Sequence, residues 1–177
     1  MKSAGLTVTS LIQEAFPPVS RPSDSDLTVH GDACRFCSGV IEDFKVEKGV
    51  TFTPERARSL LGELSTLSPS GFRWVLPSYL AAIFVDEANL DLGEFLAYHF
   101  CGELRKDEEA ERDARVHVLS GLQIDCLIRI LSEIRSSLGS AYYESVDEAV
   151  SFLCRRRKQL AEQGAAGQPL GLSTFLP

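Results

Sequence analysis

Apolar residues recur along most of the chain at intervals of three and four, the spacing that places side chains on one face of an α-helix. The clearest run follows Ser120 and predicts a helix over about residues 121–138. Its expected core face consists of Ile124, Leu127, Leu131, Ile134 and Leu138. Ser120 and Gln123 also have the spacing of a capping box, which marks a helix start.

Similar patterns predict helices at both ends of the chain. A first helix over residues 7–16 should stop at Pro17 and Pro18. Asp32 is expected to cap a second helix over residues 33–46. The apolar stripe of that helix is expected to be Phe36, Val40, Ile41 and Phe44. A capping box from Ser145 to Glu148 predicts the start of a last helix, which runs to about residue 163 with Val146, Ala149, Val150 and Leu153 facing inward.

Prolines mark two further helix starts in the middle of the chain. Thr53-Pro54 and Ser68-Pro69 each join a hydroxyl cap to a proline, whose missing N–H group costs nothing in the first turn. The first of these helices is expected to place Ala57, Leu60, Leu61, Leu64 and Leu67 on one face. In the second, Pro77 removes a backbone hydrogen bond and clashes with the preceding turn. We therefore expect a kink or break before Pro77, at a bend buried in the centre of the fold.

Two more segments complete the predicted architecture. The segment over residues 86–102 should form a helix that buries Leu90, Leu92, Phe95, Leu96 and Phe100 and ends at Gly102. The charged run over residues 105–115 is expected to be an exposed turn or helix end. These elements predict an all-α, or nearly all-α, compact single-domain multi-helix bundle with a proline-bent central helix. The expected helical domain covers residues 1–163, and residues 164–177 are expected to form a flexible C-terminal tail.

Composition and charge narrow the functional classes. The 177 residues suffice for one hydrophobic core, and 25 acidic against 18 basic residues give a net charge of −7. Such a surface argues against nucleic acid as a ligand, because phosphate binding requires basic residues. It favours a basic protein partner, although a net charge of this size is also typical of a protein that is simply kept in solution.

The sequence features that bear on cellular location favour the cytoplasm. No stretch approaches the roughly 18 apolar residues that cross a bilayer, and the first 16 residues lack an apolar run of signal-peptide type. The 5 cysteines are an odd number at scattered positions, which fits a reducing compartment. We expect a cytoplasmic protein with no membrane association.

One group of residues consists of side chains that commonly bind metal ions. His30, Cys34 and Cys37 lie close in the sequence, and on a helix the two cysteines would share a face. A zinc site needs about four ligands, so the pair alone is incomplete. Structural cysteines, a metal site and redox use therefore remain as three interpretations. Cys101 with His117 or His99 lacks a third orienting group for nucleophilic catalysis. Glycine-rich phosphate loops and common hydrolase motifs are missing, so we expect no enzyme and no cofactor.

The charge distribution contains one uneven interval. No lysine or arginine occurs between Arg73 and Arg105. The same interval holds Asp86, Glu87, Asp91, Glu94 and Glu103, which we take as candidate partner-binding residues. Their negative field favours a basic partner. The alternative is a solvated helix face that is neutralised by Arg56, Arg58 or the cluster over residues 155–158.

Several segments together resemble a family of small bacterial proteins that is classed as a domain of unknown function and is immunity-protein-like. The shared pattern is a Ser/Thr-Pro, Phe, Leu-Pro-x-Tyr-Leu core, here "SPSGFRWVLPSYL" over residues 68–80. The weaker matching pieces are "IQEAFPPVSRPSDSD", "CRFC" and "LSGLQIDCLIRILSEI", so the resemblance covers about residues 10–135. Gly71, Trp74 and the longer C-terminal end depart from the family pattern. The resemblance implies a packed bend at Pro77 and no particular activity.

These observations lead to a functional hypothesis. We expect an immunity- or antitoxin-like protein that neutralises a cognate bacterial toxin, such as a nuclease effector, by direct binding and occlusion. The acids of residues 86–103 would then meet the basic surface of the toxin. One alternative is a metal-binding module or metal-dependent enzyme that uses Cys34, Cys37 and His30. Another is a scaffold or oligomerisation domain.

Overall fold

The computed structural model describes residues 2–46, 54–58, 64–85, 90–101, 106–137 and 143–166. The predicted all-α class is confirmed, because the described residues form helices and contain no strand beyond one isolated bridge between Thr28 and Leu67. The helices are α1 (Lys2–Ala15), α2 (Asp24–Leu27), α3 (Arg35–Phe44), α4 (Pro54–Arg58), α5 (Pro69–Ile83), α6 (Leu90–Phe100), α7 (Lys106–His117), α8 (Gly121–Ser137) and α9 (Tyr143–Ala166). Two short 3₁₀ helices lie in the connections: Gly31–Ala33 between α2 and α3, and Leu64–Thr66 between α4 and α5.

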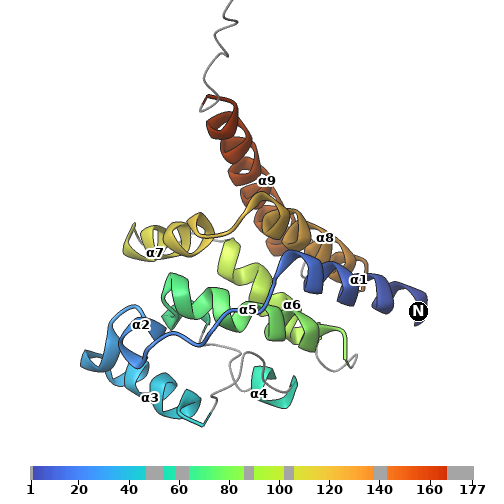
Figure 1. Ribbon diagram of the computed structural model, residues 1–177. Coiled ribbons are helices and arrows are strands. Elements are labelled where there is room, and N and C mark those ends of the chain that lie inside the picture. Colours follow the sequence, from blue (N-terminus) through green and yellow to red (C-terminus); the bar gives the residue numbers. More distant parts are fainter. Residues whose placement is uncertain are drawn as a thin grey trace, which may run out of the picture.

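Helices α5 and α6 occupy the middle of the molecule (Figure 1). Helix α5 contacts α1, α2, α4, α6 and α7, and α6 also packs against α8 and α9. The long α9 runs beside α8 and extends beyond the rest of the bundle (Figure 1). None of the helices in the described part of the chain is long and apolar enough to cross a membrane. One hydrophobic cluster joins the buried residues of α1, α3, α5, α6, α8 and α9.

Helix α5 is buried except along one stripe, where Ser70, Arg73 and Ala81 are exposed, and it passes through Pro77 as a single helix. The expected division into two helices at Pro77 is therefore wrong, whereas the expected bend stays a prediction. A proline inside a helix costs about 3 kcal/mol, whereas each large apolar side chain buried contributes about 1.5–3 kcal/mol. Ten residues of α5 are buried: Gly71, Phe72, Trp74, Val75, Leu76, Ser78, Tyr79, Leu80, Ala82 and Ile83. Packing on both sides of Pro77 thus outweighs the lost hydrogen bond. The Tyr79 hydroxyl donates to the Leu92 carbonyl at 3.1 Å, which ties α5 to α6.

The start of α5 is held against the end of α2. The predicted cap is confirmed, since the Ser68 hydroxyl accepts a hydrogen bond from the Gly71 N–H group at 3.0 Å. The Ser68 N–H group in turn donates to the Leu27 carbonyl at 3.1 Å. A Cβ atom at Gly71 would lie only 2.1 Å from that carbonyl oxygen, so the close approach of the two segments requires glycine here.

The register of α3 differs from the prediction. Cys34, not Asp32, occupies the N-cap position. The buried stripe is Cys37, Val40, Ile41 and Phe44, which has the i, i+3, i+4, i+7 spacing of one helix face. Phe36 was expected in the core but is 80 % exposed. Because Phe36 precedes the stripe by one position, it lies on the outer side of the helix.

Other boundaries and pairings were also set by packing. Residues 106–117, expected as a turn or helix end, form the three-turn helix α7. Helix α9 begins at Tyr143, so Ser145 lies inside the helix and not at its cap. The capping box at Ser120 is confirmed by bonds of 2.9 Å and 3.3 Å between Ser120 and Gln123. Asp125 of α8 pairs with Arg157 of α9 at 3.0 Å, which ties the two helices together.

Core predictions for the remaining helices have mixed outcomes. The four described residues of the expected α8 face, Ile124, Leu127, Leu131 and Ile134, are fully buried. In α6, Leu92, Leu96 and Phe100 are buried, but Phe95 is 40 % exposed. The side chains of Leu90 and Leu138, the cap at Thr53, Leu60, Leu61 and Gly102 lie outside the described residues. Helix α9 continues to Ala166, past the expected domain end at residue 163, and residues 167–177 are outside the described part.

Gly71→Ala is expected to destabilise the protein by about 3 kcal/mol, because the new methyl group would force α2 and α5 apart. The matched control is Gly39→Ala in α3, where a Cβ atom meets nothing within 4 Å. That substitution should stabilise the helix by about 0.5–1 kcal/mol. Denaturant unfolding of both variants measures the difference, and equal unfolding free energies would contradict the close packing at Gly71.

Candidate functional site

Two of the five predicted partner-binding residues, Asp91 and Glu94, are described, and both lie on α6. Asp86, Glu87 and Glu103 lie outside the described residues. Asp91 and Glu94 share a helix face with Phe95 and Tyr98, at i, i+3, i+4 and i+7. The opposite face of α6 is buried and comprises Leu92, Leu96, Ala97 and Phe100.

This outer face of α6, called here the α6 face and defined by Asp91, Glu94, Phe95 and Tyr98, combines acids with exposed aromatics. Phe95 is 40 % exposed and Tyr98 is 51 % exposed. Exposed aromatic side chains are enriched at the centres of protein interfaces, where they supply large contact areas. Sequence reasoning placed Phe95 in the core and did not consider Tyr98. The period-3.6 pattern alone could not separate them, because both residues border the apolar stripe.

The two carboxylates of the α6 face have different surroundings. An oxygen of Asp91 lies 3.2 Å from the Arg58 guanidinium on α4, so this acid is partly neutralised. Burial, followed by the negative charge of Asp91, raises the pKa of Glu94. Within the described part of the chain, no cation lies at ion-pair distance from Glu94. Arg58 thus partly neutralises Asp91, as expected for a neutralised helix face.

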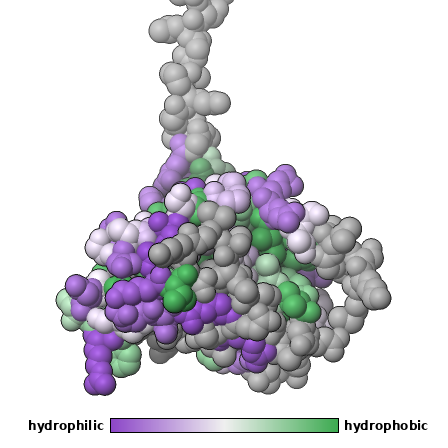
Figure 2. All heavy atoms as spheres, turned by 60° about the horizontal axis from the view of Figure 1, so that its bottom comes forward, coloured by the Kyte–Doolittle hydropathy of each residue, from purple (hydrophilic) through white to green (hydrophobic). Residues whose placement is uncertain are grey.

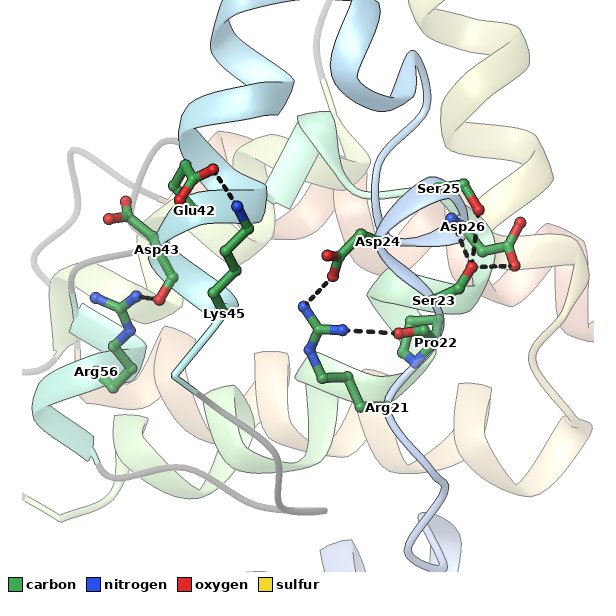
Figure 3. A network of polar contacts seen from close by, with 10 residues as sticks. All are labelled: Arg21, Pro22, Ser23, Asp24, Ser25, Asp26, Glu42, Asp43, Lys45 and Arg56. Atoms are coloured by element: carbon green, nitrogen blue, oxygen red, sulfur yellow. Dashed lines mark hydrogen bonds and ion pairs between the residues drawn. The ribbon is translucent and has the colours of Figure 1, made fainter.

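The other proposed neutralising residues have partners elsewhere. Arg56 donates to the backbone carbonyl of Asp43 (Figure 3). Its guanidinium also lies over the ring of Phe44. In the cluster over residues 155–158, Arg157 pairs with Asp125 at 3.0 Å. Arg156 hydrogen-bonds His117 at 2.6 Å. These basic residues are therefore committed to structural contacts.

A second acidic region surrounds α2 and the end of α3, but its acids are mostly paired. Arg21 binds Asp24 at 2.7 Å and the Pro22 carbonyl at 3.0 Å (Figure 3). Lys45 pairs with Glu42 in the last turn of α3 (Figure 3). Hydrophilic residues predominate on the described part of the face that includes α3 and α4, where hydrophobic residues form small separate groups (Figure 2). This region offers no continuous apolar surface.

An open hollow of about 870 Å³ lies between the end of α6, α7 and α9. Its walls carry the acids Glu109, Glu144, Asp147 and Glu148 together with Arg112 and Arg155. Asp147 binds Arg135 at 2.6 Å, and the Arg112 guanidinium lies 4.3 Å from the Phe152 ring centre. The hollow is a further acidic surface that sequence reasoning missed, because its residues come from helices far apart in the chain.

The structure brings His30, Cys34 and Cys37 together. Their ligand atoms all lie within 4.8 Å of one another, and no other such group of three occurs among the described residues. Cys37 is buried, and its sulfur lies 3.8 Å from His30 Nδ1. Cys34 sits at the start of α3, where the backbone N–H groups of Cys37 and Phe36 lower the pKa of its thiol. The composite site that the spacing made geometrically feasible is thus formed.

A polar chain leads from His30 to the core. Glu111 of α7 lies 3.8 Å from His30 Nε2 through one oxygen and 3.7 Å from Arg115 through the other. Arg115 is only 3 % exposed and donates to the carbonyls of Ser65 at 2.9 Å and Leu67 at 3.2 Å. Its Nε also donates to His99 Nε2 at 3.2 Å. Glu111 and Arg115 belong to the charged run that looked purely exposed in sequence.

The considered nucleophile pairs are not supported by their surroundings. Burial raises the pKa of the Cys101 thiol, which disfavours the thiolate. Burial, and then the positive charges of Arg115 and Arg112, lower the pKa of His99 to about 3. His99 is therefore a neutral acceptor for Arg115, and it stacks on Phe72 at a ring-centre distance of 5.1 Å. His117 is exposed and bound by Arg156.

A scan of the sequence against protein-family models found no match, and searches of curated proteins and of solved structures also found none. The family resemblance of residues 10–135 consequently stays a prediction, and the site must be interpreted from its own geometry.

His99 should make the protein acid-sensitive. Its folded-state pKa of about 3 lies below the usual value near 6.5, so below pH ~6.5 the unfolded chain binds a proton that the folded chain does not. Stability is therefore fully present above pH ~6.5 and is lost as the pH falls, by up to ~1.4 kcal/mol per pH unit from this group. His99→Gln, which keeps an acceptor for Arg115, should remove this part of the slope.

The measurement is the unfolding free energy of wild type and variant at several pH values between 7 and 4. His117→Gln, a change of an exposed histidine in α7, is the control and should leave the wild-type slope intact. Parallel curves for wild type and His99→Gln would contradict a buried neutral imidazole.

Proposed function

We propose that this protein is a binding protein of the immunity or antitoxin class, which neutralises a basic bacterial toxin by occluding its surface. The observation that carries the proposal is the α6 face, where exposed Phe95 and Tyr98 adjoin Asp91 and Glu94, and where no cation of the described residues pairs with Glu94. The net charge of −7 supports a basic partner, since complementary charge accelerates encounter and disfavours wrong partners.

The geometry of the α6 face suits docking. Its acids and aromatics are fixed on a helix whose other side is fully buried, so little conformational entropy is lost on binding. Phe95 and Tyr98 would supply the apolar centre of the contact, and Glu94 would pair with a lysine or arginine of the partner. The negative charge of Asp91 raises the pKa of Glu94, and an approaching cation would relieve that repulsion.

Neutralisation by occlusion requires no reactive histidine or thiol. The described histidines other than His30 are held by arginines, and Cys101 is a buried thiol. A toxin that acts on nucleic acid needs a basic surface to bind phosphate, and an acidic helix face can cover such a surface. A nuclease effector is therefore the class of partner that we favour.

The test uses the purified chain and the products of the genes encoded on either side of its own gene. We expect one of these products to be basic and toxic on expression, and to bind this chain with nanomolar affinity. Glu94→Lys should slow association and weaken binding at least about 10-fold, and Tyr98→Ala should weaken it by about 10- to 100-fold through faster dissociation. Protection of growth should fall in parallel.

Matched substitutions on other helices separate the α6 face from a general charge effect. Glu14→Lys on α1 reverses one exposed charge, and Leu122→Ala on α8 trims one exposed apolar residue that is 47 % exposed. Both should bind like wild type. If Glu144→Lys in the hollow abolishes binding while Glu94→Lys does not, the α6 face is the wrong surface. If neither neighbouring product binds, the neutralising function itself is wrong.

A further inference from the structure

We propose that His30, Cys34 and Cys37 form a binding site for a zinc-class divalent transition metal. The site lies between the 3₁₀ turn Gly31–Ala33 and the start of α3, on residues separate from the α6 face. It goes beyond the proposed binding function, because neutralisation by occlusion requires no metal.

The distances agree with metal ligation. Zinc bonds of about 2.3 Å to sulfur and about 2.0 Å to nitrogen place two ligand atoms about 3.5 Å apart at the tetrahedral angle. Cys37 Sγ and His30 Nδ1 are 3.8 Å apart, and all three ligand atoms lie within 4.8 Å. His30 is exposed and Cys34 is half-buried, so neither side chain is enclosed by the core.

Glu111 supplies the outer contact that metal-bound histidines usually have. A ligating imidazole commonly directs its other nitrogen to a carboxylate, which fixes the ring orientation and the proton position. Here Nδ1 faces Cys37 and Nε2 lies 3.8 Å from Glu111. Glu111 is itself held by the buried Arg115 at 3.7 Å. This arrangement is a specific reason to prefer metal binding over three coincident side chains.

The backbone around the cluster is fixed by hydrogen bonds before any ion binds. Val29 N–H donates to the Thr66 carbonyl at 2.9 Å, next to the bridge between Thr28 and Leu67. Gly31 has a φ of +57°, a left-handed conformation that glycine adopts without strain and that reverses the chain after His30. The Ser38 hydroxyl then ties α3 to the Asp32 carbonyl at 2.8 Å. Such preorganisation lowers the entropic cost of binding.

The ligand set selects the kind of ion. Two thiolates and one imidazole favour zinc and its relatives over magnesium or calcium, which prefer oxygen ligands. Two thiolates also balance the charge of a divalent ion. Three protein ligands leave a fourth tetrahedral position, which water or a partner side chain can fill.

The competing interpretation is a redox pair, because Cys34 occupies a helix N-cap with Cys37 three residues later. Formation of a Cys34–Cys37 disulfide would release two electrons and two protons to an oxidant, and it would use neither His30 nor Glu111. The placement of the imidazole against Cys37 therefore favours the metal site, and the experiment must separate the two.

The test titrates the reduced, metal-free full chain with Co²⁺ under anaerobic conditions and then adds Zn²⁺. We expect one Co²⁺ per chain, with a sulfur-to-cobalt charge-transfer band and the visible bands of tetrahedral cobalt, both lost when Zn²⁺ displaces the ion. His30→Gln and Cys34→Ser change residues that are not buried, so both variants should fold. Each should weaken binding by more than about 100-fold, because the loss of a direct ligand exceeds the 10- to 100-fold cost of losing an outer partner.

Matched controls use residues of the same types outside the cluster. Cys154→Ser changes an exposed cysteine of α9, and His117→Gln changes an exposed histidine of α7. Both should leave cobalt binding at the wild-type level. Glu111→Gln should weaken binding about 10-fold, while Glu109→Gln, an exposed acid on the same helix, should not.

Three outcomes would overturn the proposal. The first is the absence of a cobalt–thiolate spectrum in the folded wild-type chain. The second is undiminished binding by both His30→Gln and Cys34→Ser. The third is a reduced chain that binds no metal but forms a reversible Cys34–Cys37 disulfide on mild oxidation. Each leaves the docking function of the α6 face untouched, so failure of the metal site is distinguishable from failure of the proposed function.

Discussion

The contact on which the arrangement of the central helices depends is the buried guanidinium of Arg115. A charged group that is 3 % exposed must have its donors satisfied, because an unpaired buried charge costs several kcal/mol. The structure meets this requirement with the carbonyls of Ser65 and Leu67, the imidazole of His99 and the carboxylate of Glu111. These partners come from the connection before α5, from α6 and from α7. One side chain therefore fixes three segments relative to one another, and burial lowers its pKa while Glu111 acts in the opposite direction.

The hydrophobic centre complements this polar contact. Helix α5 is covered by five other helices, and its large side chains fill the space among them. Trp74 packs edge-on against Phe44 with ring centres 5.3 Å apart, and Phe72 lies against His99 and Phe100. Because the centre is filled, the features available to ligands lie on its periphery: the α6 face, the hollow between α7 and α9, and the cluster at the start of α3. The α6 face is rigid for the same reason, since its opposite side is part of the core.

The polar chain from His99 through Arg115 and Glu111 to His30 joins the core to the metal-ligand cluster. It consists of distances of 3.2, 3.7 and 3.8 Å between successive groups. His99 is neutral, Arg115 is charged, and Glu111 lies between two nitrogen-bearing side chains. Glu111 consequently serves the fold through Arg115 and the cluster through His30.

The sequence by itself determined the helical class, the caps at Ser68 and Ser120, the core face of α8, and the feasibility of a cluster of His30, Cys34 and Cys37. Those features depend on local spacing and on hydrogen bonds between residues a few positions apart. The sequence showed that the acids of α6 fall within one interval without basic residues. It did not show that the exposed aromatic residues Phe95 and Tyr98 lie beside them. Only the tertiary structure decided that α5 continues through Pro77, that Phe36 and Phe95 lie outside the core, and that Glu111 and Arg115 lie inside a polar network. The physical reason is that these outcomes depend on which segments meet in space. Burial energy and the satisfaction of buried charges then override the preferences of single residues.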